Sequence, residues 1–327
     1  MNQSDQVLES IALSVVVPLF NEEDNVEPLV RRLTEVLECI REPYEIILID
    51  DGSQDATWEV IKTLSISNSR LKALGLSRNF GHQHALLAGL SHAQGQAVIS
   101  MDGDLQHPPE VIPELVGAWK KGFKVVVTDR RGQKALPPFK RLTSKYFYKI
   151  FSFMSEVSLS EGSSDFRMID RSALKSLLSF RDANIFLRGA VQWLGFRSIT
   201  VRYNVAERFS GQTKFSLKKM LRFASGAVLS FSNKPLRLGI WIGILTSALA
   251  FLEILYVLVQ YLRGMTVTGW ASIVGILSLM FGFLFILLGV IGSYLGSIHQ
   301  ALQNRPKFIV DRHIKIGESS TQRTRNV

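Results

Sequence analysis

The amino-acid sequence predicts an α/β domain followed by a pair of membrane helices. Three observations lead to this prediction. Short β-branched runs alternate with amphipathic helical patterns in the first half of the chain, two long apolar runs follow, and most of the excess positive charge lies beside those runs. At 327 residues the chain can bury a large core. Its one cysteine, Cys39, excludes a disulfide framework and a multi-cysteine zinc site.

Five short apolar runs are predicted to be strands, because they are rich in β-branched residues and bounded by turn residues. They cover residues 13–19, 44–49, 71–76, 97–101 and 124–128. Helical patterns lie between them at residues 26–40, 57–65, 85–93 and 109–120. Strands that alternate with helices of this length are typical of right-handed βαβ crossovers, so we expect a largely parallel sheet.

Polar clusters follow three of these strands, where ligands bind in parallel sheets. Asp102 and Asp104 flank Gly103, so both carboxylates can turn toward one cation while the glycine allows close approach of the backbone. Hard oxygen ligands suit Mg²⁺ or Mn²⁺, although a solvated turn is the alternative explanation. The other two clusters are Asn21-Glu22 and Asp50-Asp51-Gly52-Ser53.

Other phosphate and metal motifs are missing from the sequence. It contains no G-x-x-x-x-G-K-[ST], and no strand opens into G-x-G-x-x-G, which disfavours the P-loop and dinucleotide classes. His82, His84 and His92 do not have the spacing of a zinc motif, so we interpret them as surface or pocket-lining residues.

Two apolar runs near the C-terminus predict a transmembrane helical hairpin. Residues 238–262 are interrupted only by Glu253 and Gln260, and residues 264–298 contain no charged side chain. A bilayer core needs roughly 20 apolar residues in a helix, so each run is long enough to span it. We place the spans at about residues 238–262 and 270–295; a pair of buried helices in a soluble core is the weaker alternative.

The net charge of +10 is concentrated next to these runs. Residues 1–200 carry a net charge of −1, whereas residues 201–235 carry +6 and residues 299–327 carry +4. By the positive-inside rule, both flanks and both termini are cytoplasmic, and the turn between the helices is outside. The first ten residues do not resemble a signal peptide. We therefore expect an integral protein of the inner or plasma membrane and no nucleic-acid partner.

Five ordered segments carry a family resemblance. They are V-P-L-F-N-E from Val17, I-D-D-G-S-Q-D-A-T from Ile49, R-N-F-G from Arg78, M-D-G-D-L-Q-H-P-P-E from Met101 and E-R-F-S-G-Q-T-K-F-S from Glu207. Together they resemble the inverting GT-A glycosyltransferases, and more narrowly the polyprenyl-phosphate sugar transferases. The two-span tail is similar to the bactoprenol glucosyltransferase branch rather than to the tail-less dolichyl-phosphate mannose synthases.

The resemblance implies a Rossmann-like GT-A fold, a nucleotide-sugar donor and a polyprenyl phosphate acceptor. It implies transfer of a hexose, with glucose from UDP-glucose as the first expectation and mannose from GDP-mannose as the alternative. A GT-A enzyme with a different acceptor and a non-catalytic membrane adaptor are the remaining alternatives. The implied cofactor is Mg²⁺ or Mn²⁺.

The resemblance also assigns roles to residues of this sequence. The donor-binding residues would be Pro18, Phe20, Asn21, Glu22, Asp51, Asp102 and Arg208. The metal and the diphosphate would be held by Asp104, Gln106 and Asp102, and Arg208 would grip the leaving diphosphate. The acceptor phosphate would contact basic residues and a serine from Arg130, Arg131, Lys140, Arg141 and Ser144. Asp165 would be the catalytic carboxylate, acting as a base or as an orienting group, and its structural alternative is a helix N-cap.

The domain organisation follows from these expectations. Residues 1–210 form the catalytic domain, residues 211–235 an interfacial amphipathic helix, residues 236–298 the two spans, and residues 299–327 a basic tail. Residues 138–155 and 214–231 both mix basic with aromatic side chains, as interfacial helices do. Such a membrane arrangement is compatible with a homo-oligomer.

Overall fold

The structure is a computed structural model that describes residues 11–131, 163–180, 186–204, 234–264, 269–303 and 305–316. The described residues fall into two compact units. The first contains the described residues up to position 204 together with residues 306–316, and the second contains residues 234–264, 269–303 and 305. The predicted interfacial segments at residues 138–155 and 214–231 lie outside the described part of the chain.

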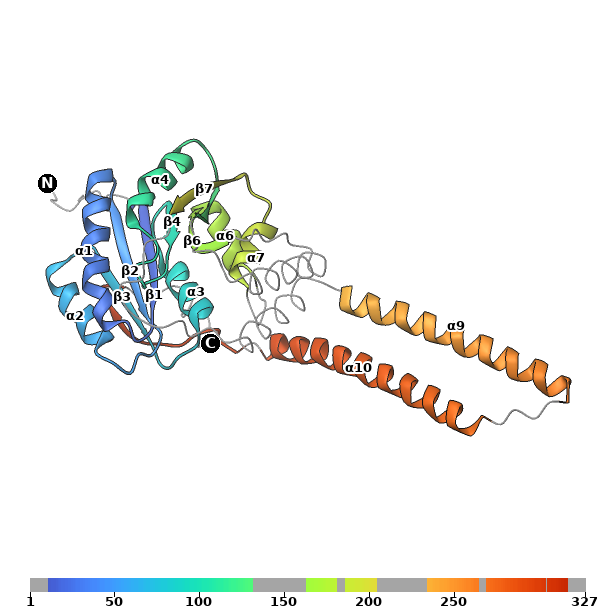
Figure 1. The fold of residues 1–327 in the computed structure, drawn as a ribbon. Coiled ribbons are helices and arrows are strands. Elements are labelled where there is room, and N and C mark those ends of the chain that lie inside the picture. The colour runs from blue at the N-terminus through green and yellow to red at the C-terminus, as the bar shows by residue number, and fades with distance from the viewer. Residues whose placement is uncertain are drawn as a thin grey trace, which may run out of the picture. The chain divides into compact units, whose positions relative to one another are not determined.

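The first unit is built on one mixed sheet (Figure 1). Among the described residues its strand order is β7-β5-β6-β4-β1-β2-β3-β8. The strands are β1 (Leu13–Leu19), β2 (Tyr44–Asp50), β3 (Leu71–Leu76), β4 (Ala97–Ser100), β5 (Val125–Arg131), β6 (Ser163–Asp170), β7 (Ser198–Asn204) and β8 (Val310–Ile314).

The direction of the strands confirms part of the prediction and corrects the rest. Strands β4, β1, β2 and β3 run parallel, as the βαβ pattern predicts, and β7 is parallel to β5. However, β6 is antiparallel to both β4 and β5, and β8 is antiparallel to β3. The sheet is therefore mixed. The predicted elements alternate only up to residue 128, so the sequence pattern did not include the strands that reverse direction.

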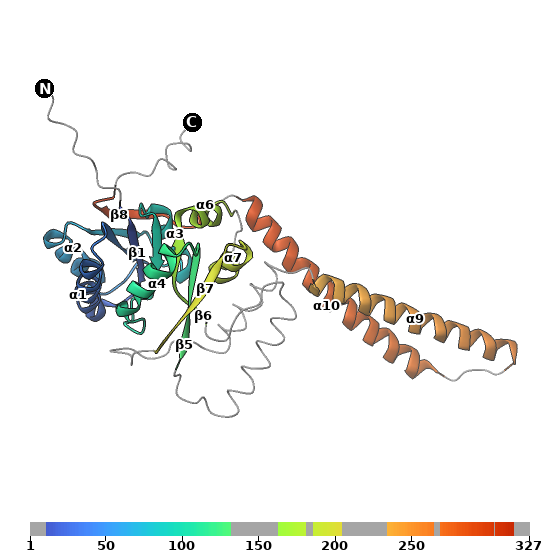
Figure 2. The same ribbon diagram turned by 90° about the horizontal axis from the view of Figure 1, so that it is seen from above.

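Helices cover both faces of this sheet (Figures 1 and 2). Leu29 and Leu33 of α1 share a core with Val15 and Val17 of β1, and α4 adds Leu115 to the same core. On the other face, a Cβ on Gly89 of α3 would lie 2.3 Å from Val16 and 2.5 Å from Ile49. The helices are α1 (Glu23–Ile40), α2 (Thr57–Ser67), α3 (His82–His92), the 3-10 turn η1 (Pro109–Val111), α4 (Ile112–Lys120), α6 (Arg171–Leu178) and α7 (Leu187–Trp193).

Strands β1 and β2 are buried along their whole length, which explains why they read as continuous apolar runs. The four predicted helices are confirmed with small shifts of their ends. Helix α1 begins three residues earlier than predicted, at Glu23, and its first turn carries Glu23 and Asp24, whose charges favour a helix N-terminus. It ends at Ile40, and the cap residue Arg41 adopts a left-handed conformation with φ of 60°.

The second unit consists of two long helices, α9 (Lys234–Leu262) and α10 (Trp270–Leu302). They lie side by side, and a Cβ on Gly239 would be only 2.3 Å from Cδ1 of Leu287. Within the described part of the chain, one segment, Gly275–Leu302, is long and apolar enough to cross a membrane, and α9 contributes a shorter apolar stretch, Gly239–Leu249. A helix is thus found at each predicted span, and the two membrane crossings stay predictions.

The chain after α10 differs from the predicted basic tail. Helix α10 continues to Leu302, past the boundary at residue 298, and residues 310–314 form the edge strand β8. This strand belongs to the first unit, where it pairs with β3. The C-terminal region therefore contributes to the sheet of the predicted catalytic domain.

Candidate active site

The carboxyl end of β4 and the neighbouring strand β6 bring two carboxylates together. Asp102 follows β4, and Asp165 lies within β6, which runs antiparallel to β4 with Ser100 paired to Arg167. Ser100 Oγ donates a hydrogen bond of 2.6 Å to the backbone oxygen of Asp165 and fixes this alignment. Asp165 is therefore a strand residue and not a helix N-cap; the cap of α6 is Asp170, whose side chain accepts from Ser172 N.

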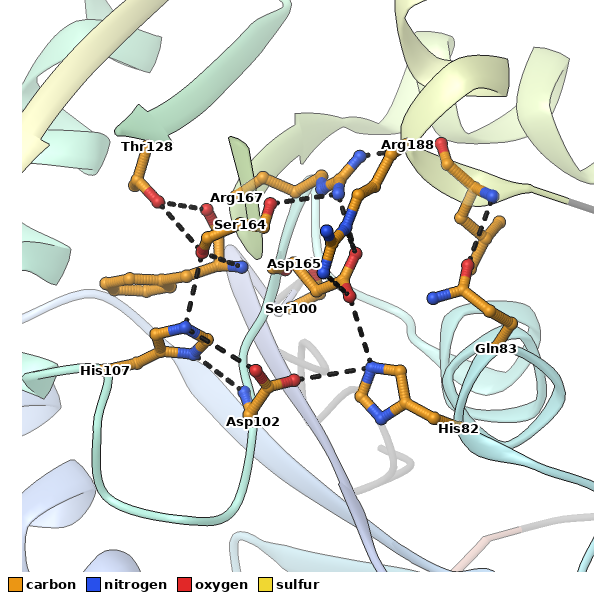
Figure 3. A network of polar contacts seen from close by, with 12 residues as sticks. His82, Gln83, Ser100, Asp102, His107, Thr128, Ser164, Asp165, Arg167 and Arg188 are labelled. Carbon is orange, nitrogen blue, oxygen red and sulfur yellow. Dashed lines mark hydrogen bonds and ion pairs between the residues drawn. The ribbon is translucent and has the colours of Figure 1, made fainter. Parts of the chain in front are cut away.

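Asp165 is surrounded by cationic donors (Figure 3). Arg188 Nε donates to Oδ1 at 2.9 Å and Arg188 Nη2 donates to Oδ2 at 2.7 Å. Arg167 Nη2 donates to Oδ1 at 2.8 Å, and His82 Nε2 lies 3.4 Å from Oδ2. The Asp165 side chain is only 3% exposed, so these contacts replace water around its charge.

These contacts determine the charge of Asp165. Burial raises the pKa of its carboxyl, but the charge and hydrogen bonds of Arg188, together with His82 and Arg167, outweigh burial and hold the pKa well below its ordinary value. Asp165 is therefore a permanent anion at neutral pH. Such a carboxylate orients cations well and accepts protons poorly.

His82, the first residue of α3, joins the two carboxylates. Its Nε2 lies 3.4 Å from Asp102 Oδ1 and 3.4 Å from Asp165 Oδ2. Partial removal from water lowers its pKa, but the hydrogen bond to Asp165 and the charges of Asp102 and Asp165 raise the pKa above the ordinary histidine value. The His82 side chain is 42% exposed, within the surface or pocket-lining interpretation, and it has one carboxylate partner on each side, Asp102 and Asp165.

His107 supports the loop that follows β4. It is fully buried, and its Nδ1 accepts a 3.0 Å hydrogen bond from the backbone N–H of Asp102, so its proton lies on Nε2. Nε2 faces Ser164 Oγ at 3.3 Å and Asp102 Oδ2 at 3.6 Å. Between these anchors Leu105 is buried in a left-handed conformation with φ of 61°, which is rare for a bulky residue and is common at functional loops.

Five of the predicted donor-binding residues lie in or directly after β1 and β2: Pro18, Phe20, Asn21, Glu22 and Asp51. Asp51 accepts hydrogen bonds from the backbone N–H groups of Phe80, at 2.8 Å, and Gly81, at 2.9 Å. Burial raises the pKa of Asp51 above its ordinary value, and these two hydrogen bonds offset only part of that effect. Asn21 has φ of 54°, donates its backbone N–H to Ser53 Oγ and accepts from Gln54 N. The loops after β1, β2 and β3 therefore form one connected surface.

The remaining predicted site residues lie in β1, in the loops after β1 and β4, at the end of β5, or outside the described part of the chain. Pro18 lies within buried β1, whereas the Phe20 side chain beyond it is 36% exposed. Glu22 Oε2 accepts a hydrogen bond from Asn25 Nδ2, and Asp104 Oδ1 accepts one from Gln106 N. Arg130 and Arg131 end strand β5, beside β6. The predicted residues outside the described part of the chain are Lys140, Arg141, Ser144 and Arg208.

Three residues of the site had no role in the sequence prediction: His107, Arg167 and Arg188 (Figure 3). The i, i+2 spacing of Asp165 and Arg167 on a strand is the signal that could have paired them, because it places both on one face. Arg188 has no such signal. It reaches Asp165 from α7, across a connection of 22 residues whose path the sequence does not reveal.

Asp102 and Asp104 suit a divalent cation, whereas Asp165 does not. Among the described residues, the ligand atoms of His82, Asp102 and Asp165 lie within 4.8 Å of one another. Asp165 fits poorly as a ligand, because its oxygens already accept from two arginines and a cation there would be repelled by them. Asp102 and Asp104 supply the hard oxygen donors that Mg²⁺ and Mn²⁺ prefer, so these residues fit the metal.

A family model and a relative of similar length both relate this chain to glycosyltransferases. The family model described as "Glycosyl transferase family 2" matches residues 14–178, which contain β2 to β4, all of β1 but its first residue, Asp102 and Asp165. The chain is 39% identical over 303 residues to "Uncharacterized glycosyltransferase YkcC" of Bacillus subtilis (strain 168), covering 92% of this chain and 94% of the relative.

Two further similarities were found. The chain is 36% identical over 301 residues to the "SfII prophage-derived bactoprenol glucosyl transferase" of Shigella flexneri, covering 92% of this chain and 97% of the relative. The crystal structure of mannosyl-3-phosphoglycerate synthase from Rubrobacter xylanophilus aligns at 18% identity, with a TM-score of 0.47 over 67% of this chain and 72% of that chain.

Proposed function

The chain belongs to glycosyl transferase family 2 and is a hexosyltransferase, and from this premise we propose that it moves a hexose from a nucleoside diphosphate sugar to a polyprenyl phosphate. The preferred donor is UDP-glucose, and GDP-mannose is the alternative. The product is a membrane-linked phospho-sugar, formed on the cytoplasmic side for later use across the membrane.

One observation carries this proposal. The buried Asp165 carboxylate is held by two arginines and lies close to Asp102, and both carboxylates fall within the segment that matches the family. The relative named as a bactoprenol glucosyl transferase supports the lipid acceptor, because the similarity covers 92% of this chain and therefore includes both long helices.

The proposed reaction is a single displacement. An oxygen of the acceptor phosphate attacks the anomeric carbon of the sugar and forms a new C–O bond. The bond to the donor diphosphate breaks, and its electron pair leaves with the nucleoside diphosphate. Because the second pKa of a phosphate monoester is about 6, the acceptor is already an anion near neutral pH and needs no strong base.

This chemistry gives Asp165 an orienting role. Its carboxylate holds Arg188 by two hydrogen bonds and lies next to His82, so it fixes cationic groups at the place where two phosphates must meet. Fixed charges that need no rearrangement stabilise a transition state in which negative charge moves to a leaving group. When bound by Asp102 and Asp104, a divalent metal would neutralise charge on the leaving diphosphate. Arg208 would assist at the same diphosphate.

The membrane arrangement completes the proposal. Helices α9 and α10 would both cross the bilayer, leaving the sheet and both termini in the cytoplasm. The apolar segment Gly275–Leu302 supports one crossing, and large side chains exposed along both helices favour an apolar surrounding. In this arrangement the protein would take its polyprenyl phosphate from the cytoplasmic leaflet of the membrane that its helices cross.

A lipid-extraction assay tests the proposed function. The full-length protein is incubated in detergent with undecaprenyl phosphate, Mg²⁺ or Mn²⁺ and radiolabelled UDP-glucose or GDP-mannose, and label in the organic phase is counted. We expect label from one donor, loss of label on chelation, and loss of label in Asp104→Ala. Glu38→Ala, an exposed carboxylate at the far end of α1, serves as the matched control. Absence of lipid-bound label with every common nucleotide sugar would refute the proposal.

A further inference from the structure

The C-terminal strand β8 reaches the predicted nucleotide loops from outside the segment that matches the family. It pairs antiparallel with β3 and forms that edge of the sheet, although more than 200 residues separate the two strands in sequence. The backbone N–H of Ser77, at the start of the loop after β3, donates to the oxygen of Ile309 at 3.0 Å. Lys315 donates to the backbone oxygens of Ser65 and Asn68 at the end of α2.

Three residues on adjacent strands lie in one row. Asp50 of β2 pairs with Gly75 of β3, and Gly75 pairs with Arg312 of β8. The Arg312 side chain passes over the glycine, and its Nη2 reaches Asp50 Oδ2 at 3.3 Å. A Cβ on Gly75 would lie 3.1 Å from Arg312 Nε and 3.2 Å from Trp58, so the absence of a side chain leaves this path open.

The position of Arg312 is supported from a second side. Its guanidinium lies over the Trp58 ring, 4.4 Å from the centroid, which adds a cation–π interaction to the charge pair. Asp50 is fully buried, with an exposed fraction of 0%. A buried carboxylate needs compensation by a cation or by hydrogen bonds, and Arg312 supplies a cation to it.

Asp50 in turn organises the loop that precedes α2. Its Oδ1 accepts the backbone N–H of Ser53 at 2.9 Å, and Ser53 Oγ accepts the backbone N–H of Asn21 at 3.0 Å. Asp51, the next residue, holds the loop after β3 through Phe80 and Gly81. Asn21 and Asp51 are both predicted to bind the donor, so a chain of contacts runs from Arg312 to the predicted nucleotide surface.

We propose that Arg312 is a positioning residue for nucleotide binding. By compensating Asp50, it holds the turn at residues 50–53, and with it Asn21 and Asp51, in the arrangement that receives the nucleoside of the donor. The inference rests on the proposed function for the identity of the ligand. It makes the segment after the second long helix part of the donor site, rather than a free basic tail.

Nucleotide binding to the full-length protein tests this role without the lipid acceptor. UDP, and GDP in a parallel titration, is added to the detergent-solubilised protein in an isothermal titration calorimeter with Mn²⁺ present. We expect Arg312→Ala to raise the Kd of the bound nucleotide about tenfold and Arg312→Lys to recover part of the loss. His313→Ala, an exposed neighbour in the same strand, should leave the Kd unchanged. Thermal unfolding of each variant confirms that it is folded.

A double-mutant cycle separates a role through Asp50 from a general loss of structure. In an Asp50→Asn background the charge that Arg312 compensates is absent, so adding Arg312→Ala should change the Kd less than it does in the wild type. Two results would overturn the inference in a wild type that binds nucleotide. The first is an equal nucleotide Kd in the wild type and in Arg312→Ala. The second is an effect of Arg312→Ala on the Kd that is the same in the wild type and in the Asp50→Asn background. Failure of the wild type to bind either nucleotide would instead refute the proposed function.

Discussion

Arg188 and Asp165 form a two-point ion pair, in which Nε and Nη2 of the arginine donate to separate oxygens of the carboxylate at 2.9 and 2.7 Å. A planar guanidinium matches a carboxylate in this way, and a lysine cannot. The Asp165 side chain is 3% exposed and that of Arg188 is 31% exposed, so the pair extends from the core to the accessible surface of the site. Its geometry fixes the arginine at the place where the proposed function puts the phosphates.

Replacing Arg188 by lysine should lower kcat about 10- to 100-fold and should change the donor KM less, because lysine keeps the charge and loses the fork. Label transfer at varied donor concentration measures both parameters. Arg197→Lys is the matched control, since its guanidinium lies over the Phe123 ring, 4.5 Å from the centroid. Wild-type turnover in Arg188→Lys would show that the two-point geometry has no part in the reaction.

Asp165→Asn distinguishes an orienting carboxylate from a general base. Because Arg188 and its neighbours hold the pKa of Asp165 well below its ordinary value, the rate below pH 7 should follow the acceptor phosphate, whose second pKa is about 6. We expect the variant to turn over about 100-fold more slowly. Its pH–rate profile should keep the same acid limb, which is the fall in rate as the acceptor phosphate is protonated. Disappearance of that limb in Asp165→Asn would identify Asp165 as the base instead.

The sequence predicted best the elements whose burial is uniform. Strands β1 and β2 are buried along their whole length, so they appear as unbroken apolar runs. Strand β6 reads S-S-D-F-R-M-I-D and β8 reads V-D-R-H-I; neither resembles a buried strand, because each carries polar residues with specific partners. Local pattern could not indicate that β6 would lie next to β4 or that β8 would return to β3.

Local sequence pattern also revealed only part of the candidate site. Asp102 and Asp104 could be proposed as ligands because two carboxylates flank a glycine directly after a strand. The contacts of Asp165 with His82 and Arg188 join residues that are 83 and 23 positions apart, and only the strand order brings them together. The capping alternative for Asp165 failed for a related reason, since the helix begins after Asp170, at the far end of the same strand.

Gly52→Ala should destabilise the protein and weaken nucleotide binding. Gly52 has φ of 69°, and an added Cβ would lie 2.5 Å from the backbone carbon of Arg78. A left-handed backbone costs a residue with a Cβ about 1 kcal/mol, and the overlap with Arg78 adds to this cost. We therefore expect the free energy of unfolding to fall by about 2–4 kcal/mol. Gly122→Ala is the control, because Gly122 has φ of 89° with no atom within 4 Å and should lose only about 1 kcal/mol. Thermal unfolding with and without UDP measures both effects, and equal losses in the two variants would contradict the prediction.

Asp170 gives the stability of the first unit a defined pH dependence. Burial raises its pKa, but hydrogen bonds from Ser172, Trp119 and Lys124 outweigh burial and place the pKa far below the ordinary value of 3.8. Because the pKa is lowered, the ionised Asp170 carboxylate stabilises the folded protein above pH 3.8. This stabilisation is lost as the pH falls toward the pKa of Asp170 in the folded state. Asp170→Ala should therefore cost about 1–2 kcal/mol at pH 6. The difference between variant and wild type should narrow below pH 3.8, as thermal unfolding across this range will show; a constant difference would exclude the ionised cap.

The proposed membrane orientation predicts which cysteines react from outside the cell. The wild type has one cysteine, the exposed Cys39 in α1, which should react with a membrane-impermeant maleimide only after the cells are permeabilised. In a Cys39→Ser background, Gly264→Cys between the two helices should react in intact cells, whereas His313→Cys in β8 should require permeabilisation. The reason is that the positive charge flanks the helix pair, so both of its outer ends should stay in the cytoplasm. Labelling of Gly264→Cys and His313→Cys from the same side would mean that only one helix crosses, and the apolar segment Gly275–Leu302 would then be the single span.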